Sequence, residues 1–308
     1  MKDNIVYIDL LTDYGFKHVF GDKEDKYILM ASLNACLADF TETITELTFL
    51  PTEKLGDKPS EKRVIFDLYC KNQRGEHFII ELQRTSQHFY ADRSISYVSR
   101  IISSELQRGD RFYHIPRVYS INILEFNADE FAGRENYFWS VQLKDNDNEI
   151  FSKKIMLVFI ELNKFAARNK ESEFRDELQK WIYILKNISK MECPDPRLQD
   201  DVFLKLFEKC KYSKLDNMEK EKYRKSVLEY EDVQDAVSYA EERALAAGYE
   251  KGKAEGEAKG HAKGLAEGHA EGLAEGKVKI ARTMLENNFD IATISRLTGL
   301  SEEEIRKL

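Results

Sequence analysis

The stretch "IFDLYCKNQRGEHFIIELQR" (residues 65–84) decides the fold, because two apolar runs flank a short polar segment in it. The polar segment ends at Gly75, and glycine readily adopts the left-handed conformation that closes a three-residue hairpin loop. The stretch therefore predicts an antiparallel hairpin with its loop at Gln73, Arg74 and Gly75. Counting outward from this loop gives four pairs: Asn72 with Glu76, Tyr69 with Ile79, Asp67 with Glu81, and Ile65 with Gln83.

This register separates a polar face from an apolar face. Because strand side chains alternate, Asp67, Glu81 and Gln83 share one face. The other face can pack under a helix; it carries Phe66, Leu68, Ile80 and Leu82. Two acids directly across an antiparallel pair repel each other unless a cation lies between them. Hard oxygen ligands of this kind suit Mg²⁺ or Mn²⁺ as a cofactor, although an edge hairpin with solvent-facing acids has the same spacing.

The composition is that of a globular protein: of 308 residues, 42% are hydrophobic and 33% are charged, with a net charge of −8. A chain this acidic contacts nucleic acid only through a local basic surface. Its four cysteines are far apart in sequence, which argues against a disulfide framework or a zinc ribbon. The N-terminal segment lacks a signal-peptide core, and the longest apolar run is too short to span a bilayer. These features predict a cytoplasmic protein without a membrane segment.

Helical and strand patterns alternate along roughly the first half of the chain. Helices are expected in two pieces over 13–40, split at Gly21, and over 86–107, ended by Gly109. Strands rich in Val, Ile, Tyr and Phe are expected at 44–50, 117–126, 136–143 and 154–165. From residue 171 the chain is expected to be mostly helical, with one break at 193–196. This order predicts an α/β or α+β core, with a mixed sheet flanked by helices.

The tail is a repeat in which glycine occupies every fourth position from Gly248 to Gly276, with alanine frequent two places later. Glycine costs a lone helix about 1 kcal/mol per position relative to alanine. Small residues four apart let two helices approach closely, and the intervening Lys, Glu and His exclude a membrane span. The repeat therefore predicts a self-associating helical stalk; a flexible linker is the alternative.

The last segment, "DIATISRLTGLSEEEIRKL" (290–308), has helix-turn-helix spacing with a turn at Gly299. DNA readout needs basic or amide side chains early in the second helix. That helix begins instead with Ser301 and three glutamates, which cap a helix N-terminus but repel phosphate. We therefore favour a small protein-contact or capping module over a DNA reader.

Four segments together carry a resemblance: "TDYGFKHVFG" (12–21), the hairpin stretch, the block at 93–124, and the Gly/Ala/Glu/Lys tail. In these segments the chain resembles the Rpn family of recombination-promoting nucleases, also described as PD-(D/E)XK nuclease family transposases. The resemblance covers residues 8–165 well and the tail by composition. It implies a restriction-endonuclease-like domain and a metal-dependent phosphodiesterase that acts on DNA.

The resemblance also implies roles for individual residues. Asp67 matches the first motif acid and Glu81 the second, and both would hold the metal. The superfamily pattern has a lysine two residues after the second acid, where this sequence has Gln83, which can position water but brings no positive charge. Asp13 and Lys17, in the N-terminal motif, are additional candidates for the metal and the phosphate. Helix capping by Asp13 and a salt bridge between these two residues are the alternatives.

A local basic surface agrees with DNA as the partner. Residues 60–120 contain ten Lys or Arg and seven Asp or Glu, a net charge of +3. Arg93, Tyr97 and Arg100 are spaced to share one face of the helix expected at 86–107. We assign these three residues and Arg84 to DNA contact, with an ordinary solvated helix face as the alternative for the helix residues.

The sequence thus predicts a metal-dependent DNA endonuclease associated with recombination or mobile elements, which forms a homo-oligomer, most simply a dimer, through its tail. The alternative is a nuclease-derived scaffold that binds DNA or protein without cutting; Gln83 in place of lysine favours it. Four regions are expected: a nuclease-like domain at 1–168, a helical region at 169–247, the repeat stalk or linker at 248–277, and a small helical module at 278–308.

Overall fold

The computed structural model describes the chain except for residues 1–4, 55–63, 87–88, 107–113 and 169–172. The chain divides into two compact units, Met1–Gln234 and Asp235–Leu308. The boundary expected at 168 falls inside the first unit, because the helices that follow it fill the same hydrophobic core as the sheet. The helix stop expected at Gly109 lies outside the described residues.

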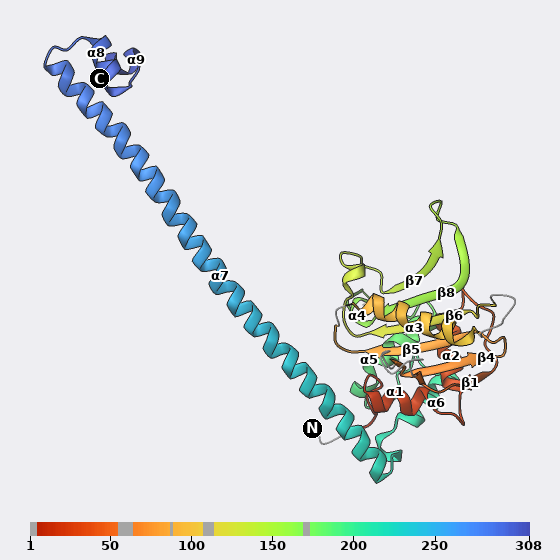
Figure 1. Cartoon of the computed structure of the whole chain (residues 1–308). Coiled ribbons are helices and arrows are strands. Elements are labelled where there is room, and N and C mark those ends of the chain that lie inside the picture. The colour runs from red at the N-terminus through yellow and green to blue at the C-terminus, as the bar shows by residue number, and fades with distance from the viewer. Residues whose placement is uncertain (1–4, 55–63, 87–88, 107–113, 169–172) are drawn as a thin grey trace. The chain divides into compact units, whose positions relative to one another are not determined.

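A six-stranded mixed sheet forms the centre of the first unit (Figure 1). Its strands, in spatial order, are β1 (Leu47–Phe49), β4 (Leu68–Asn72), β5 (His77–Gln83), β6 (Val118–Leu124), β8 (Ile150–Glu161) and β7 (Phe138–Lys144). Strands β5, β6 and β8 are parallel, while β1, β4 and β7 pair antiparallel with their neighbours. A separate two-stranded sheet pairs β2 (Glu53–Lys54) with β3 (Val64–Ile65).

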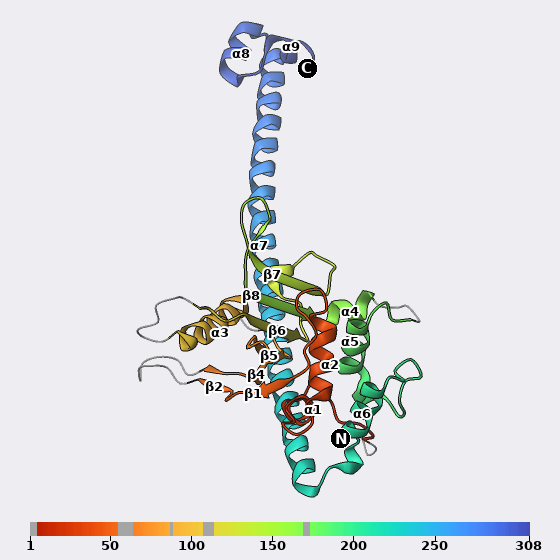
Figure 2. The ribbon, with the colours of Figure 1, turned by 90° about the vertical axis from the view of Figure 1, so that its right-hand side faces the viewer.

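Helices cover both faces of this sheet (Figure 2). One face is covered by α1 (Asp13–Phe20), α2 (Tyr27–Cys36), α5 (Glu177–Asn187) and α6 (Asp201–Cys210). The other face is covered by α3 (Tyr90–Glu105) and the 3-10 helix η1 (Asp129–Phe131). Strand alternation explains the two layers, since Phe78 and Ile80 join the first core and Ile79 joins the second. The predicted mixed sheet flanked by helices is confirmed.

Shorter elements connect these layers. Helix α4 (Leu162–Arg168) follows β8 directly, and the 3-10 helices η2 (Ile188–Lys190) and η3 (Tyr212–Lys214) flank α6. The chain between η2 and α6 is irregular, which confirms the break predicted at 193–196. The four cysteines are all free.

Near its turn, the central hairpin has the predicted loop and register. Gly75 has φ of +73°, and the Asn72 N–H donates to the Glu76 carbonyl at 3.1 Å. Tyr69 pairs with Ile79, as counted from the loop. The predicted register is therefore confirmed at this end of the hairpin.

Further from the turn the prediction is wrong. Ile65 belongs to β3 and pairs with Glu53, not with Gln83. The chain leaves the β4–β5 ladder at Phe66 and Asp67, so Phe66 packs in the α3-side core instead of sharing a face with Leu68. This kink turns the Asp67 side chain toward the end of β5.

Helix α7 (Asn217–Glu286) runs without interruption through the glycine repeat, which confirms the predicted helix. A Cβ added at any glycine from Gly248 to Gly276 would meet nothing within 4 Å beyond the helix's own backbone. The C-terminal segment forms α8 (Ile291–Thr298) and α9 (Glu302–Arg306), joined through left-handed Gly299, and Ser301 caps α9. No helix in the described ranges is both long enough and apolar enough to cross a membrane.

Candidate active site

Asp67 and Glu81 meet where the hairpin leaves its ladder. The Asp67 N–H donates to Glu81 Oε1 at 3.2 Å, and the Leu82 N–H donates to Asp67 Oδ2 at 2.8 Å. Each carboxylate therefore accepts, through one of its oxygens, a backbone N–H from the segment that carries the other acid. Asp67 Oδ1 accepts no hydrogen bond from the part of the chain that the structure describes, and Glu81 Oε2 lies 3.6 Å from Arg93 Nη2.

Burial makes this pair electrostatically unfavourable. Glu81 is only 3% exposed, and burial, reinforced by the charge of Asp67, raises the pKa of Glu81 to about 8. Burial also raises the pKa of Asp67, although the Leu82 hydrogen bond and the Lys17 charge act in the opposite direction. Two carboxylates this close remain ionised at neutral pH only when a cation compensates them.

Helix α3 places a cation and two aromatic rings beside Glu81. The guanidinium carbon of Arg93 lies 4.8 Å from the centre of the Tyr90 ring and 5.5 Å from that of Tyr97. Arg100 is half-buried and lies further along the same helix. The face that carries Arg93, Tyr97 and Arg100 therefore begins at the acid pair.

Asp13 and Lys17 approach Asp67 from α1. Asp13 and Asp67 line the same cavity of about 200 Å³, and Lys17 Nζ lies 2.5 Å from Asp13 Oδ1. The N-cap of α1 is Thr12, whose hydroxyl accepts the Gly15 N–H at 3.0 Å. Asp13 is therefore not the cap, while the salt bridge considered for it does form.

Gln83 is the last residue of β5 and lies two positions beyond Glu81, on the same face of the strand by alternation. Its partner in the parallel ladder is Leu124 of β6. Its side chain is partly exposed and makes no hydrogen bond to the described part of the chain. The amide group is therefore available beside the acids.

Arg84 is held in a largely buried cluster. Its Nε donates to Glu125 Oε2 at 2.6 Å, and its Nη1 lies 3.6 Å from Asp9 Oδ2. Its guanidinium carbon lies 3.2 Å from the centre of the Tyr230 ring, and the side chain is 14% exposed. These contacts favour an anchoring role for Arg84 over the predicted DNA contact.

Sequence reasoning missed the contribution of α7 to this site. Ser226 and Tyr230 line the same cavity as Asp67, and the Tyr14 N–H donates to Ser226 Oγ at 3.1 Å. Tyr223, Ser226 and Tyr230 have the i, i+3, i+7 spacing of one helix face, which was the available signal. That spacing does not reveal which surface this helix face contacts, because its partner Tyr14 lies more than 200 residues away in sequence.

The acid pair suits a hard divalent cation. Oxygen donors match Mg²⁺ or Mn²⁺, and a cation would favour the ionised forms of two acids whose pKa values are raised mainly by burial, with the charge of Asp67 adding to the rise at Glu81. Within the described ranges, no group of three or more His, Cys, Asp and Glu side chains is arranged to hold a metal. Two carboxylates still suffice for Mg²⁺, because it keeps several waters and also binds substrate phosphate.

The sheet, its flanking helices and the acid pair define a protein of the PD-(D/E)XK nuclease class. Two family models match the chain: PD-(D/E)XK nuclease family transposase over residues 10–240, and Rpn/YhgA-like nuclease family, C-terminal HTH domain, over residues 274–308. The chain belongs to the PD-(D/E)XK nuclease family transposases, which confirms the resemblance seen in the sequence. Neither a curated protein nor a solved structure matches it.

Proposed function

We propose that the protein is a metal-dependent DNA endonuclease that acts in the cytoplasm and serves recombination or mobile elements. The acid pair is the observation that carries this proposal. The half-buried Asp67 and the buried Glu81 lie side by side, both with raised pKa values, and the ion pair from Glu81 to Arg93 is long at 3.6 Å. A pair with a purely structural role would be expected to have a closer cation.

The residues around the pair have distinct proposed roles. Asp67 and Glu81 hold the metal through the oxygens not committed to backbone hydrogen bonds. A bound divalent cation supplies an activated water and neutralises charge on the phosphate. Gln83 positions the attacking water through its amide. Lys17 and Arg93, whose charges both act on Glu81, supply the positive charge that Gln83 lacks.

The DNA path follows from the same geometry. Arg93 lies at the acid pair, and Tyr97 and Arg100 continue along α3. Arginine donates to backbone phosphates, and an exposed aromatic edge can contact a sugar or base. We keep these three residues as the DNA-contacting face and reassign Arg84 to anchoring β5 against Tyr230 of α7.

Nicking of supercoiled plasmid in Mg²⁺ or Mn²⁺ tests the activity. The informative variants are Asp67→Asn and Glu81→Gln, because each amide keeps an oxygen that can accept the backbone hydrogen bond seen here. We expect nicking by the wild type, its loss in both variants, and no change in Glu149→Gln, which alters an exposed carboxylate before β8. Equal nicking by all four proteins would refute the site assignment.

A scaffold that binds DNA without cutting is the second candidate. Two observations favour it: Gln83 replaces the usual lysine, and the described residues offer no third metal-ligating side chain in a cluster. Absence of nicking by the wild type, together with retained DNA binding, would establish this alternative. A Gln83→Lys variant then becomes the test of whether charge alone was missing.

We also propose that the glycine repeat of α7 packs against a second copy of the chain. No contact within the described chain accounts for the eight glycines, and each one weakens a lone helix by about 1 kcal/mol. Light scattering of a 248–308 deletion should show loss of the oligomer. Gly260→Leu should weaken association, while Glu257→Gln in the same helix should not; an unchanged mass in the deletion would refute the proposal.

A further inference from the structure

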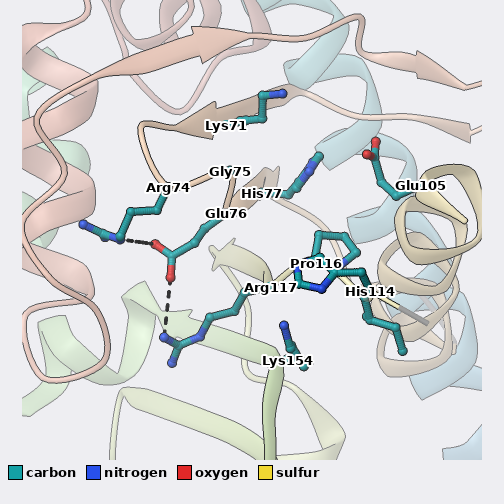
Figure 3. Close-up of a pocket in the computed structure, with 11 residues that line it drawn as sticks. Lys71, Arg74, Gly75, Glu76, His77, Glu105, His114, Pro116, Arg117 and Lys154 are labelled. Carbon is teal, nitrogen blue, oxygen red and sulfur yellow. Dashed lines mark hydrogen bonds and ion pairs between the residues drawn. The ribbon is translucent and has the colours of Figure 1, made fainter. Parts of the chain in front are cut away.

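A second, polar cavity lies at the opposite end of β5 from the acid pair (Figure 3). It measures about 880 Å³ and is formed by the hairpin turn, the end of α3, the segment before β6 and the start of β8. His77 begins β5 and Gln83 ends it, so the two sites lie roughly 20 Å apart at about 3.3 Å per residue. The cavity is therefore distinct from the candidate active site.

The lining of this cavity favours a charged ligand. Eight of its eleven lining residues carry ionisable side chains, whereas pockets for ordinary small molecules are mostly apolar. Four of the eight are cations, namely Lys71, Arg74, Arg117 and Lys154. Two are carboxylates, so the net charge is +2 with both histidines neutral. This charge favours an anion in a chain whose total charge is −8.

Glu76 arranges two of these cations. Its Oε2 accepts hydrogen bonds from Arg74 Nε and Nη2 at 3.1 and 2.9 Å, and its Oε1 lies 3.5 Å from Arg117 Nη1. Burial opposes ionisation, but hydrogen bonds from Asn72 and Arg74 lower the pKa of Glu76 below its usual value. Glu76 therefore stays ionised and holds both guanidinium groups at the rim.

Three donors in the cavity remain unused. The Arg117 Nε is buried and has no hydrogen-bond partner among the described residues. Over the same residues, the amino groups of Lys71 and Lys154 form no hydrogen bond or ion pair. A buried N–H without a partner costs about 1–3 kcal/mol, while the two exposed lysine amino groups are open to a bound acceptor.

The position of the anion within the cavity follows from its acidic side. Glu105 ends α3, where the helix carbonyls add partial negative charge. Figure 3 shows Arg117 and Lys154 together on one side, with Glu105 on the side of His77. An anion is therefore favoured beside Arg117 and Lys154, away from Glu105.

We propose that this cavity binds a phosphate group, held by Arg117 and Lys154 with Lys71 as an outer contact. Arginine and lysine form charge-assisted hydrogen bonds with phosphate oxygens. The expected source is the backbone of DNA bound by the proposed nuclease, and to that extent the inference rests on the proposed function. A free phosphate or a mononucleotide carries the same chemical group and is the other source.

Binding without cleavage tests the proposal. Full-length protein in EDTA is titrated against fluorescently labelled duplex and single-stranded DNA at several salt concentrations. The test variant is Lys71→Ala combined with Lys154→Ala. The control is Lys153→Ala, which is exposed and adjacent in β8 but does not line the cavity. The double variant should lower the slope of log K against log salt by about one unit per lost phosphate contact, with a roughly tenfold loss of affinity.

A second arm separates the sources. Chemical-shift changes or thermal stabilisation are followed with inorganic phosphate and with a deoxynucleoside monophosphate. A defect of the double variant in the DNA arm identifies a backbone phosphate, and a defect confined to the second arm identifies a small phosphate compound. Unchanged binding in both arms overturns the proposal. Nicking in Mg²⁺ is scored separately, so failure of the nuclease assignment does not mask the outcome in EDTA.

Discussion

Glu76 and Glu81 lie five residues apart in one hairpin, and both are at most 9% exposed. Glu76 receives hydrogen bonds from Asn72, Arg74 and Thr41, which together keep its pKa below the usual value. Glu81 accepts a backbone N–H and feels the charges of Arg93, 3.6 Å away, and of Lys17, yet burial and the charge of Asp67 raise its pKa to about 8. The two acids thus have opposite electrostatic outcomes, and Glu81 is the more deeply buried of the two.

The difference shows what, besides burial, sets the pKa of an acid in this hairpin. Burial raises the cost of a charge at both positions, and more at Glu81, but it cannot account for the lowered pKa of Glu76. What discriminates is whether the protein supplies the compensating charge itself. At Glu76 it does, through Arg74; at Glu81 the nearest arginine nitrogen is 3.6 Å away, and we propose a metal ion as the further compensating charge.

The largest expected effect that follows from this comparison is on catalysis. Glu81→Gln should lower the rate of metal-dependent nicking by at least about 100-fold, because it removes a charged ligand where phosphate charge must be neutralised. Glu76→Gln should leave the rate at saturating DNA within about threefold of wild type. Initial rates on supercoiled plasmid in Mn²⁺ measure both. If Glu76→Gln lowers the nicking rate more than Glu81→Gln does, the two acids have been assigned the wrong way round.

The second effect is on stability, and it has opposite signs at the two positions. Glu76→Gln should destabilise the fold by about 1–3 kcal/mol, because it leaves two partly buried guanidinium groups without their carboxylate. In EDTA at pH 8.5, Glu81→Gln should stabilise it by about 1–3 kcal/mol, because an uncompensated buried charge is removed. Urea unfolding followed by circular dichroism measures both. Destabilisation by both variants would mean that Glu81 is already compensated.

A third effect is the pH dependence of the metal-free protein. Glu81 has a folded pKa of about 8 against a reference of 4.5, so the folded state binds more protons between these values. Unfolding free energy should therefore fall as pH rises from about 4.5 to 8, by at most about 1.4 kcal/mol per unit. Glu76 acts in the opposite sense, because its folded pKa is below its usual value. Its contribution to the free energy of unfolding is lost as pH falls below 4.5.

Comparison with Glu81→Gln isolates this titration. The difference in unfolding free energy between wild type and variant should grow with pH in EDTA and shrink when Mn²⁺ is added. A difference that stays constant from pH 5 to 8.5 would show that Glu81 does not carry the proton. A difference that is unaffected by Mn²⁺ would separate the acid pair from metal binding.

Local sequence was sufficient for the part of the hairpin nearest its turn. Gly75 fixes the loop, and the loop fixes the pairing of Tyr69 with Ile79 because strand register propagates residue by residue. Register no longer propagates where another strand competes: Glu53 pairs with Ile65 and draws the chain out of the ladder before Asp67. No pattern within residues 65–84 reports that competition.

The candidate site shows the same limit. The acid pair of Asp67 and Glu81 and the helix face that carries Arg93 could be predicted, because motif spacing and helical periodicity are local properties of the chain. The anchoring of Arg84 could not be predicted, since Asp9, Glu125 and Tyr230 converge on it from three segments that are distant in sequence. Arginine beside a catalytic motif looks the same in sequence whether it faces DNA or a buried carboxylate.

The smallest expected effect concerns Arg93, which together with Lys17 partly compensates the charge of Glu81. Its Nη2 lies 3.6 Å from Glu81 Oε2, beyond hydrogen-bond distance, so the attraction is weaker than that of a hydrogen-bonded ion pair. Arg93→Ala should move the pH-dependent loss of stability in EDTA upward by less than about one pH unit, because Glu81 then holds its proton more tightly. Arg93→Lys, which retains the charge, should remain close to wild type. A shift to lower pH in Arg93→Ala would mean that Arg93 desolvates Glu81 more than it compensates it, and the contrast with Glu76 would then rest on burial after all.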